Sequence, residues 1–197
     1  MAKIFEKLKK FFYRLFMGRF AYIPMRLPVE KITSDFERSL RKKVDNKLKN
    51  FTIREAKEKD IDILIELFDK AWHSTTMPFR PLNRNKIIDK ILTNPDALFL
   101  IANVGGEDTG FILIDFVGSD KNIGEISALG ILPEHQSKGI GTLLGLKSWE
   151  YFKERNVEEL ICKVYMENEK SKSFLERMGF EVDPRRNTDT LYMKKSI

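Results

Sequence analysis

The sequence predicts an α/β (α+β) fold, with a central mixed, mostly antiparallel sheet flanked by helices and a helical extension at the N-terminus. Three observations lead to this prediction. Strand and helix patterns are interspersed from residue 51 onward. Three strand patterns follow one another in the middle of the chain, and the hairpin dipeptide Gly105-Gly106 separates the first two. Residues 1–50 carry helical patterns interrupted by prolines.

The composition fits one sizeable core with an appendage. The chain has 197 residues, of which 42% are hydrophobic. Residues 1–50 hold 14 Lys and Arg against 5 Asp and Glu, whereas the remaining 147 residues hold 21 against 24. The basic character therefore belongs to the N-terminal quarter, and the rest of the chain is slightly acidic.

Cysteine usage and hydropathy predict a cytoplasmic protein. Cys162 is the single cysteine, which excludes an internal disulfide, and the sequence shows no zinc-ligand spacing, so we predict no metal site. No stretch approaches the run of about 20 apolar residues that a transmembrane helix needs. Lysines are distributed among the first hydrophobic residues, which is unlike a secretory signal.

The N-terminal extension, residues 1–50, is predicted to contain two helices. Residues 3–20 form an amphipathic basic pattern, which Pro24 and Pro28 then break. A second helix is expected from Ser34, as N-cap, to Leu48. Its apolar stripe consists of Phe36, Leu40, Val44 and Leu48. We place the domain boundary near Asn50, with a second domain over residues 51–197.

Three roles are open for this extension. Its basic helix can lie on an anionic membrane surface. It can bind nucleic acid through phosphate contacts, although the sequence lacks the aromatic-interleaved basic strand typical of RNA-binding modules. It can also pack its apolar stripe on the main domain or on a second subunit of a homodimer. Packing is favoured, with a peripheral membrane contact second and nucleic acid last.

The elements after residue 50 follow from apolar periodicity. Helices are expected over 59–72, 86–92, 139–154 and 169–178, the last ended by Gly179. Strands are expected over 51–55, 97–104, 109–118, 122–132, 159–166, 180–182 and 190–195.

The loop between the third of the consecutive strands and the next helix reads LGILPEHQSKGIGTLLG, residues 129–145. Gly139 and Gly141 leave backbone N–H groups accessible at a helix N-terminus, where the helix dipole favours an anion such as phosphate. Lys138 adds a mobile cation, and Gln136 and Ser137 add neutral donors. The alternative is that the two glycines only ease a tight turn. The phosphate-loop pattern GxxxxGK[ST] is absent, and the dinucleotide pattern GxGxxG fails at Leu144.

The segment LGILPEHQSKGIG resembles motif A of the Gcn5-related N-acetyltransferases, the GNAT family. The downstream segment YMENEKSKSFLERMGFE is similar to the family's second signature, and FTIREAKEKDIDILIELFDKAW looks like its opening strand and helix. The resemblance covers residues 51–195, and its two signatures stand in the family's order. It implies the GNAT acyl-CoA N-acyltransferase fold and acetyl-CoA as cosubstrate.

The resemblance also implies which residues bind coenzyme A. Backbone N–H groups of residues 136–141 would hold the pyrophosphate, residues 129–131 would pair with the pantetheine arm, and Asn168 would contact the pantetheine end. The implied cofactor-binding residues are Leu129, Gly130, Ile131, Gln136, Ser137, Lys138, Gly139, Ile140, Gly141, Thr142, Asn168 and Ser171.

The implied reaction is direct transfer of an acetyl group from acetyl-CoA to a primary amine. A general base must take a proton from the amine, because an ammonium has no lone pair with which to attack. Glu125 stands where one branch of the family carries such a base. Regular alternation would place Glu125 on one strand face with Ser127, Leu129 and Ile131. The alternative is a solvated carboxylate at a strand start.

The family often has a tyrosine that protonates the leaving thiolate, and here that position is occupied by Leu175. Either no side chain acts as the acid, or Tyr165 or Tyr192 does, and Tyr165 is the candidate we carry forward. His73 at a helix end and His135, expected to face solvent, are given no role. Cys162 is expected to be a packed small residue.

The acceptor site is expected between residues 72–84 and 183–189, whose arginines and aromatic groups suggest a partly hydrophobic acceptor with an acidic moiety. The sequence does not identify the acceptor. The alternative function is a catalytically silent module of the same fold that holds coenzyme A or a protein partner.

Overall fold

The computed structural model describes residues 22–45, 50–75 and 84–185. The predicted helix over residues 3–20 and the predicted strand over residues 190–195 lie outside these ranges. The chain divides into two compact units. The described part of the larger one spans residues 27–162, and that of the smaller one combines residues 22–26 with residues 163–185.

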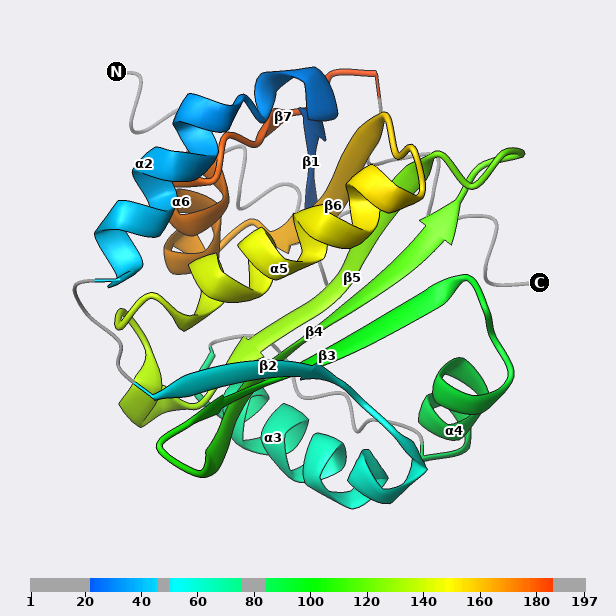
Figure 1. The fold of residues 1–197 in the computed structure, drawn as a ribbon, viewed down its shortest axis with the longest axis vertical. Helices are drawn as coiled ribbons and strands as arrows, with labels where there is room; N and C mark the ends of the chain where they lie inside the picture. Colours follow the sequence, from blue (N-terminus) through cyan, green and yellow to red (C-terminus); the bar gives the residue numbers. More distant parts are fainter. Residues whose placement is uncertain (1–21, 46–49, 76–83, 186–197) are drawn as a thin grey trace, which may run out of the picture. The chain divides into compact units, whose positions relative to one another are not determined.

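The larger unit is built on a mixed, mostly antiparallel sheet, as the sequence predicts (Figure 1). Neighbouring strands in the order β2-β3-β4-β5 are antiparallel, and β6 is parallel to β5. Their bounds are β2 (Phe51–Glu55), β3 (Ala97–Val104), β4 (Glu107–Val117), β5 (Ile123–Ile131) and β6 (Glu159–Tyr165), the last of which continues into the smaller unit. The predicted Gly105-Gly106 hairpin is confirmed, since both glycines have positive φ, 62° and 96°.

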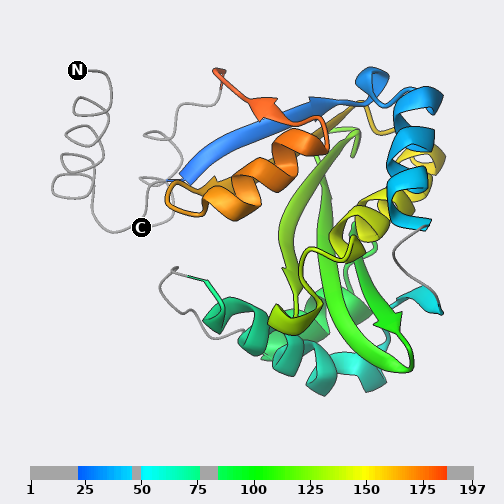
Figure 2. The ribbon, with the colours of Figure 1, turned by 90° about the vertical axis from the view of Figure 1, so that its left-hand side faces the viewer.

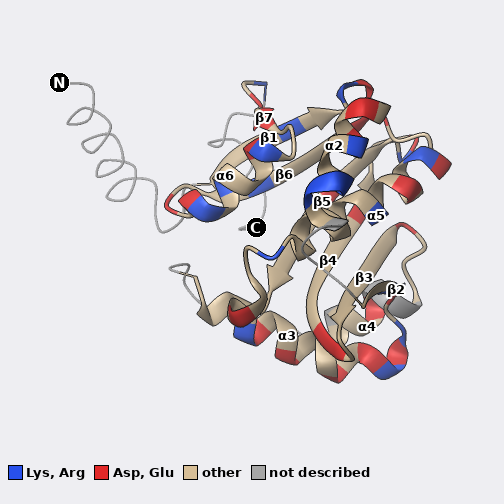
Figure 3. Cartoon of the chain, turned by 60° about the vertical axis from the view of Figure 1, so that its left-hand side comes forward, with Lys and Arg blue, Asp and Glu red and all other residues tan. Residues whose placement is uncertain are grey.

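Helices cover both faces of this sheet (Figure 2). On one face lie α3 (Ile61–His73), which follows the short helix η2 (Glu58–Asp60), and α4 (Arg84–Leu92). On the other face lie α2 (Ser34–Asp45) and α5 (Ile140–Glu154). The spacing of apolar residues explains α3: its buried side chains are Ile61, Leu64, Leu67 and Ala71. Its opposite side carries charges of both signs, as Figure 3 shows, including the ion pair Glu66–Lys70.

Helix α2 packs against α5 through the described part of the apolar stripe that the sequence predicts, whereas Leu48, the predicted end of this helix, lies outside the described residues. Leu40 and Val44 are buried, and the ring of Phe36 stacks on Trp149 with centroids 6.0 Å apart. Thr33, one residue before the predicted N-cap, accepts the Phe36 N–H through its hydroxyl. This packing agrees with the favoured role for this part of the extension.

The larger unit includes residues on both sides of residue 50, because it contains both α2 and the sheet. The domain boundary near Asn50 stays a prediction. Among the described residues, no helix combines the length and the apolar character needed to cross a membrane.

The smaller unit contains a strand that the sequence pattern does not predict. β1 (Tyr22–Pro28) pairs antiparallel with β7 (Glu181–Val182), in register Met25↔Val182, and α6 (Glu169–Arg177) belongs to the same unit. The prolines suggest a break, but a proline, which has no N–H donor, keeps its carbonyl acceptor. The Pro24 carbonyl still accepts the Asp183 N–H at 2.9 Å, so the strand persists.

Candidate functional site

Strand β5 carries a β-bulge at Ser127. Its register with β4 changes from Leu113↔Ala128 to Ile114↔Ile126, so Ser127 has no matched residue on β4. The bulge reverses which face each side chain occupies. A Cβ at Gly124 would meet Phe152 of α5 at 2.9 Å, on the face covered by α5.

Six residues later the strand presents the opposite face. A Cβ at Gly130 would meet Phe111 at 2.6 Å and Ala71 of α3 at 3.0 Å, although regular alternation would put positions 124 and 130 on the same face. Ala128 packs with the same α3 cluster.

The prediction that Glu125 shares one strand face with Ser127, Leu129 and Ile131 is therefore wrong for Leu129 and Ile131, and Ser127 is the bulge residue itself. Glu125 lies on the α3 face, because it follows Gly124 by one residue, whereas Leu129 and Ile131 lie on the α5 face beyond the bulge. The Cα partner of Glu125 on β4 is Asp115. The Ser127 hydroxyl donates a hydrogen bond to that same Asp115 carboxylate.

The other edge of β5 has a ladder partner over only part of its length. Its parallel register with β6 runs from Ile123↔Glu159 to Ile126↔Cys162, and in the described part of the chain no further pair is found on that side. The Leu132 N–H donates to the Thr109 carbonyl at 2.9 Å, on the β4 side. Because successive N–H groups of a strand point to opposite sides, Leu129 and Ile131 direct theirs to the open edge.

Beyond this edge the chain forms the short helix η3 (Pro133–His135) and enters α5 through two residues of left-handed backbone, Ser137 with φ 64° and Gly139 with φ 100°. Gly139 is the N-cap, and no side chain caps the helix there. The first helical hydrogen bond runs from the Leu143 N–H to the Gly139 carbonyl, at 3.0 Å.

The preceding N–H groups, those of Ile140, Gly141 and Thr142, consequently have no carbonyl partner within the helix. They lie at the positive end of the helix dipole, where a phosphate group binds favourably. The Ile140 side chain is buried, so this residue can contact a bound phosphate only through its backbone N–H. Lys138, which is exposed, adds a cation at the same turn. These residues therefore fit the pyrophosphate of coenzyme A.

The Gln136 side chain fastens this loop to the strand. Its amide Nε2 donates to the Ile131 carbonyl at 3.0 Å and to the Ser74 hydroxyl, beyond the end of α3, at 3.3 Å. The carbonyl of Ile131 on the open edge is thereby engaged, and the N–H groups of Leu129 and Ile131 point the same way. Sequence reasoning does not find Ser74, Asp115 or the bulge, because none of them is marked by a motif.

Three predicted site residues, Tyr165, Asn168 and Ser171, belong to the smaller unit. The Asn168 side-chain oxygen accepts the Ser171 N–H at 3.0 Å, so it caps the N-terminus of α6. The ring of Tyr165 packs edge-on against Tyr22, with centroids 5.9 Å apart. Leu175, in the family's tyrosine position, is buried. The roles of these residues in binding and proton donation stay predictions, and Tyr192 lies outside the described residues.

The two histidines differ in how far their side chains are exposed to solvent. His73 lies at the end of α3, as predicted, and its side chain is exposed. The expectation that His135 faces solvent is wrong: its side chain is only 16% exposed, and Nε2 lies 3.4 Å from a Glu107 carboxylate oxygen. Among the described residues, Glu107, Glu134 and His135 are the group whose ligand atoms come close enough for a metal ion, and both carboxylates are exposed there.

Cys162 is buried, as predicted, and its burial raises the pKa of the thiol to about 12, with a further contribution from the Glu125 carboxylate. The thiol is therefore protonated at neutral pH and is a poor nucleophile. This agrees with a packing role for Cys162.

The expected acceptor loops are described only in part. Residues 76–83 and 186–189 lie outside the described ranges. The Arg185 guanidinium forms an ion pair with the buried Asp183 carboxylate, with Nε and Oδ1 2.9 Å apart. Arg185 therefore supports its own turn, and the acceptor surface stays a prediction.

Comparison with known proteins supplies the family. The model of the acetyltransferase (GNAT) family matches residues 61–180. An uncharacterized N-acetyltransferase of Methanocaldococcus jannaschii is 27% identical over 161 residues, covering 78% of this chain and 71% of that protein. An uncharacterized N-acetyltransferase of Archaeoglobus fulgidus is 28% identical over 110 residues, covering 53% of this chain and 75% of that protein.

Solved structures agree. The PaiA N-acetyltransferase of Thermoplasma acidophilum, crystallised with coenzyme A, superposes with a TM-score of 0.64 at 25% identity, covering 72% of this chain and 96% of that one. The ribosomal-protein-S18-alanine N-acetyltransferase of Escherichia coli gives a TM-score of 0.55 at 18% identity, covering 66% of this chain and 76% of that one, which shows the fold alone. The chain therefore belongs to the GNAT acetyltransferase family, whose cosubstrate is acetyl-CoA and whose general reaction is acetyl transfer to an amine.

Proposed function

We propose that this protein is an acetyl-CoA-dependent N-acetyltransferase that transfers the acetyl group directly to a primary amine. The observation that carries the proposal is the continuity of two ligand-binding features. The open edge of β5 at Leu129 leads, within ten residues, to the N-terminus of α5 at Gly139, where no side chain caps the helix. An extended thioester arm and a diphosphate need these two features in this order.

In this proposal the chain's residues bind the cosubstrate largely through the backbone. The N–H groups of Ile140, Gly141 and Thr142 hold the phosphates, and the exposed Lys138 adds charge. The open edge of β5 pairs with the pantetheine arm as a neighbouring strand would. A β5 N–H group near Leu129 polarises the thioester carbonyl, because it can donate to the oxygen on which negative charge develops.

Glu125 acts as the general base, directly or through a water molecule. It accepts a proton from the ammonium form of the acceptor, and the neutral amine nitrogen then forms a bond to the carbonyl carbon as the carbon–sulfur bond breaks. The second proton that this nitrogen loses on becoming an amide passes to the departing thiolate, directly or through water. The thiolate of coenzyme A leaves with the bonding electrons. Its modest basicity allows it to leave without a side-chain acid, and Tyr165 is the residue proposed to protonate it if an acid is used.

The acceptor is a primary amine on a small molecule, on a peptide or protein N-terminus, or on a lysine. Two solved proteins of similar fold are named as an N-acetyltransferase of ribosomal-protein-S18 alanine and as an aminoglycoside acetyltransferase. Their names indicate that this fold serves chemically diverse acceptors. We further propose a cytoplasmic location. For the basic segment before residue 22 we propose contact with the protein itself, a second copy of the chain, or an anionic partner such as a membrane surface.

Calorimetric titration of the full chain with coenzyme A and acetyl-CoA tests the first half of the proposal. We expect saturable binding at concentrations below about 1 mM, and its absence would exclude the proposed site. A thiol-release assay with amino acids, polyamines, aminoglycosides and N-terminal peptides tests the second half. Binding without thiol release from any acceptor class would favour the alternative, a silent module that holds coenzyme A.

A further inference from the structure

Helix α2 contacts the loop at the start of α5 through Val44. A Cβ built at Gly139 would lie 3.1 Å and 3.3 Å from the two methyl carbons of Val44. Gly139 is also the N-cap of α5. Its backbone φ is 100°, a value that residues other than glycine rarely adopt. The Val44 methyl groups therefore occupy the side of Gly139 where a side chain would otherwise stand.

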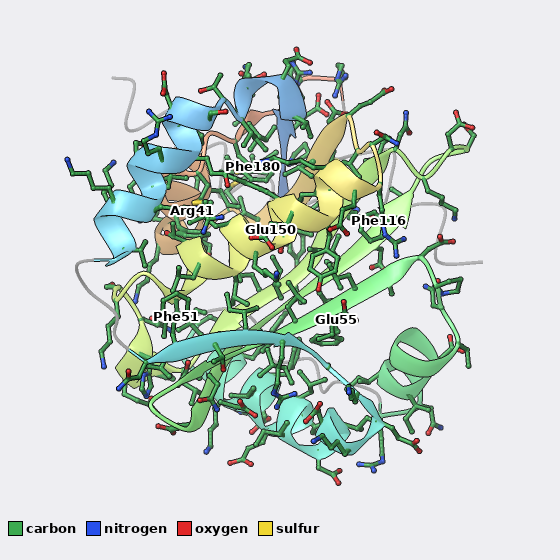
Figure 4. All side chains as sticks on the ribbon, viewed as in Figure 1. Arg41, Phe51, Glu55, Phe116, Glu150 and Phe180 are labelled. Atoms are coloured by element: carbon green, nitrogen blue, oxygen red, sulfur yellow. The ribbon has the colours of Figure 1, made fainter. Side chains whose placement is uncertain are left out.

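The rest of α2 fixes the position of Val44 along α5. Phe36 at the start of α2 stacks on Trp149 late in α5, and Val44 at the end of α2 meets Gly139 at the start of α5, so the two helices run antiparallel. Two ion pairs also join these helices, with their α5 partners beyond Trp149: Lys153–Glu37 at 2.8 Å, and Arg41–Glu150 at 3.5 Å, whose two residues Figure 4 labels. Helix α2 is thereby held along α5 with its C-terminal turn at the loop.

The contact between Val44 and Gly139 lies in the loop whose backbone conformation determines where its N–H groups point. Ser137 and Gly139 both have left-handed backbone, and the N–H groups that follow them point to one anion only while this shape is kept. Helix α2 lies outside residues 61–180, the segment that matches the family model. This chain thus braces the loop with an element that precedes the matched segment.

We propose that Val44 is a positioning residue for coenzyme A: by packing on Gly139 it holds the loop in the conformation that binds the diphosphate. The inference rests on the proposed function, because it presumes that this loop binds coenzyme A. Val44 does not touch the ligand in this proposal. Its removal therefore affects the affinity for coenzyme A and leaves the steps at Glu125 unchanged.

The test compares coenzyme A binding by the wild-type chain and by Val44→Ala, using calorimetry with coenzyme A alone. We expect Val44→Ala to bind about tenfold more weakly, since a loop misplaced by a fraction of an ångström loses aligned donors. In steady-state assays with a working acceptor the KM for acetyl-CoA rises in the same proportion, and kcat stays near the wild-type value.

Two further variants separate positioning from general stability. Phe36→Leu loosens the opposite end of the same helix contact and is expected to bind coenzyme A like the wild type. Val44→Thr keeps both γ atoms and therefore the shape beside Gly139, so it is expected to restore the affinity although the buried hydroxyl lowers the melting temperature. Thermal denaturation of all three variants confirms that each is folded at the assay temperature.

The outcomes are distinguishable. If the wild type does not bind coenzyme A, the proposed function fails. If the wild type binds and Val44→Ala binds equally well, the positioning role alone is overturned. Equal weakening by Val44→Ala and Phe36→Leu would also overturn it, because the effect would then follow the docking of α2 as a whole. Should Val44→Ala not fold, Val44→Leu takes its place, because it also changes the shape beside Gly139; wild-type affinity for coenzyme A in a folded Val44→Leu would overturn the proposal.

Discussion

Glu125 and Asp115 stand directly opposite each other on strands β5 and β4, with both carboxylates on the face of the sheet covered by α3. Like charges in opposed positions of an antiparallel pair normally destabilise a sheet. The bulge at Ser127 adds a hydroxyl that donates to Asp115. The proposed base therefore sits within an acidic, hydrogen-bonded group that one strand alone does not reveal.

Replacement of Glu125 by Gln tests its role as the base. Gln keeps the size of the side chain and removes its basicity, so we expect turnover to fall about 100-fold near pH 7 with coenzyme A affinity unchanged. The loss should shrink at high pH, where the acceptor amine is already deprotonated. The measurement is kcat as a function of pH. Asp120→Asn, the same chemical change in an exposed turn, serves as control, and wild-type turnover in Glu125→Gln would remove Glu125 from the mechanism.

Replacement of Gly141 by Val tests the phosphate-binding loop. Gly141 lies within the first turn of α5 and is absent from the residues with positive φ, so the helix accepts a side chain there. We expect unfolding free energy within about 0.5 kcal/mol of the wild type, but coenzyme A affinity at least about tenfold lower, because the side chain occupies the ligand's place. Denaturant titration and calorimetry measure the two quantities, and unchanged affinity would mean that the loop has another role.

Replacement of Gly139 by Ala should give a different result from Gly141→Val. The positive φ and the nearby methyl groups of Val44 both oppose a side chain at this position. We expect a loss of about 1–3 kcal/mol of stability together with weaker coenzyme A binding. Gly118→Ala, at a φ of 93° in a turn remote from the loop, should lose stability without losing affinity. A fully stable Gly139→Ala would contradict the constraint that the structure places on this residue.

Cys162 is expected to be chemically silent. Since burial raises the pKa of its thiol to about 12, only about one thiol in ten thousand is ionised at pH 8. Native protein should resist iodoacetamide at pH 8 and become labelled on unfolding, and Cys162→Ala should keep the wild-type turnover. Mass spectrometry follows the labelling. Loss of turnover in a folded Cys162→Ala would instead favour an acyl-cysteine intermediate over direct transfer.

Asp60 should make the fold sensitive to acid. Burial alone would raise the pKa of this carboxyl, but hydrogen bonds from the Lys57 N–H at 2.8 Å and from Arg54 at 2.7 Å lower it overall. A lowered pKa means stability that is present above the unfolded pKa near 4 and lost as the pH falls through the folded pKa. Asp60→Asn should therefore be less stable by about 2 kcal/mol at pH 7. Its urea midpoint should approach the wild-type value below pH 3, and a constant difference at all pH values would refute the linkage.

Apolar periodicity and turn residues, which are properties of the sequence alone, determined most elements of this fold. The apolar run in residues 97–104 and the glycine pair after it predict a hairpin because both signals are local. The family's two signatures likewise mark the loop at Gly139 and the cap at Asn168, since each is a contiguous string. Strand β1 is not predicted from the sequence, because its partner β7 is more than 150 residues away along the chain. Its prolines also suggest a break when they are considered locally.

The tertiary structure decided the relationships that connect distant segments. The face occupied by Glu125 depends on a bulge, and a bulge exists only relative to the partner strand, so no pattern within β5 could reveal it. The contact between Val44 and Gly139 likewise arises from the antiparallel packing of α2 on α5. The sequence by itself determined which backbone groups are available to bind an anion, because glycine and helix starts act locally. Packing decided what holds those groups in place, since that depends on side chains brought together only by folding.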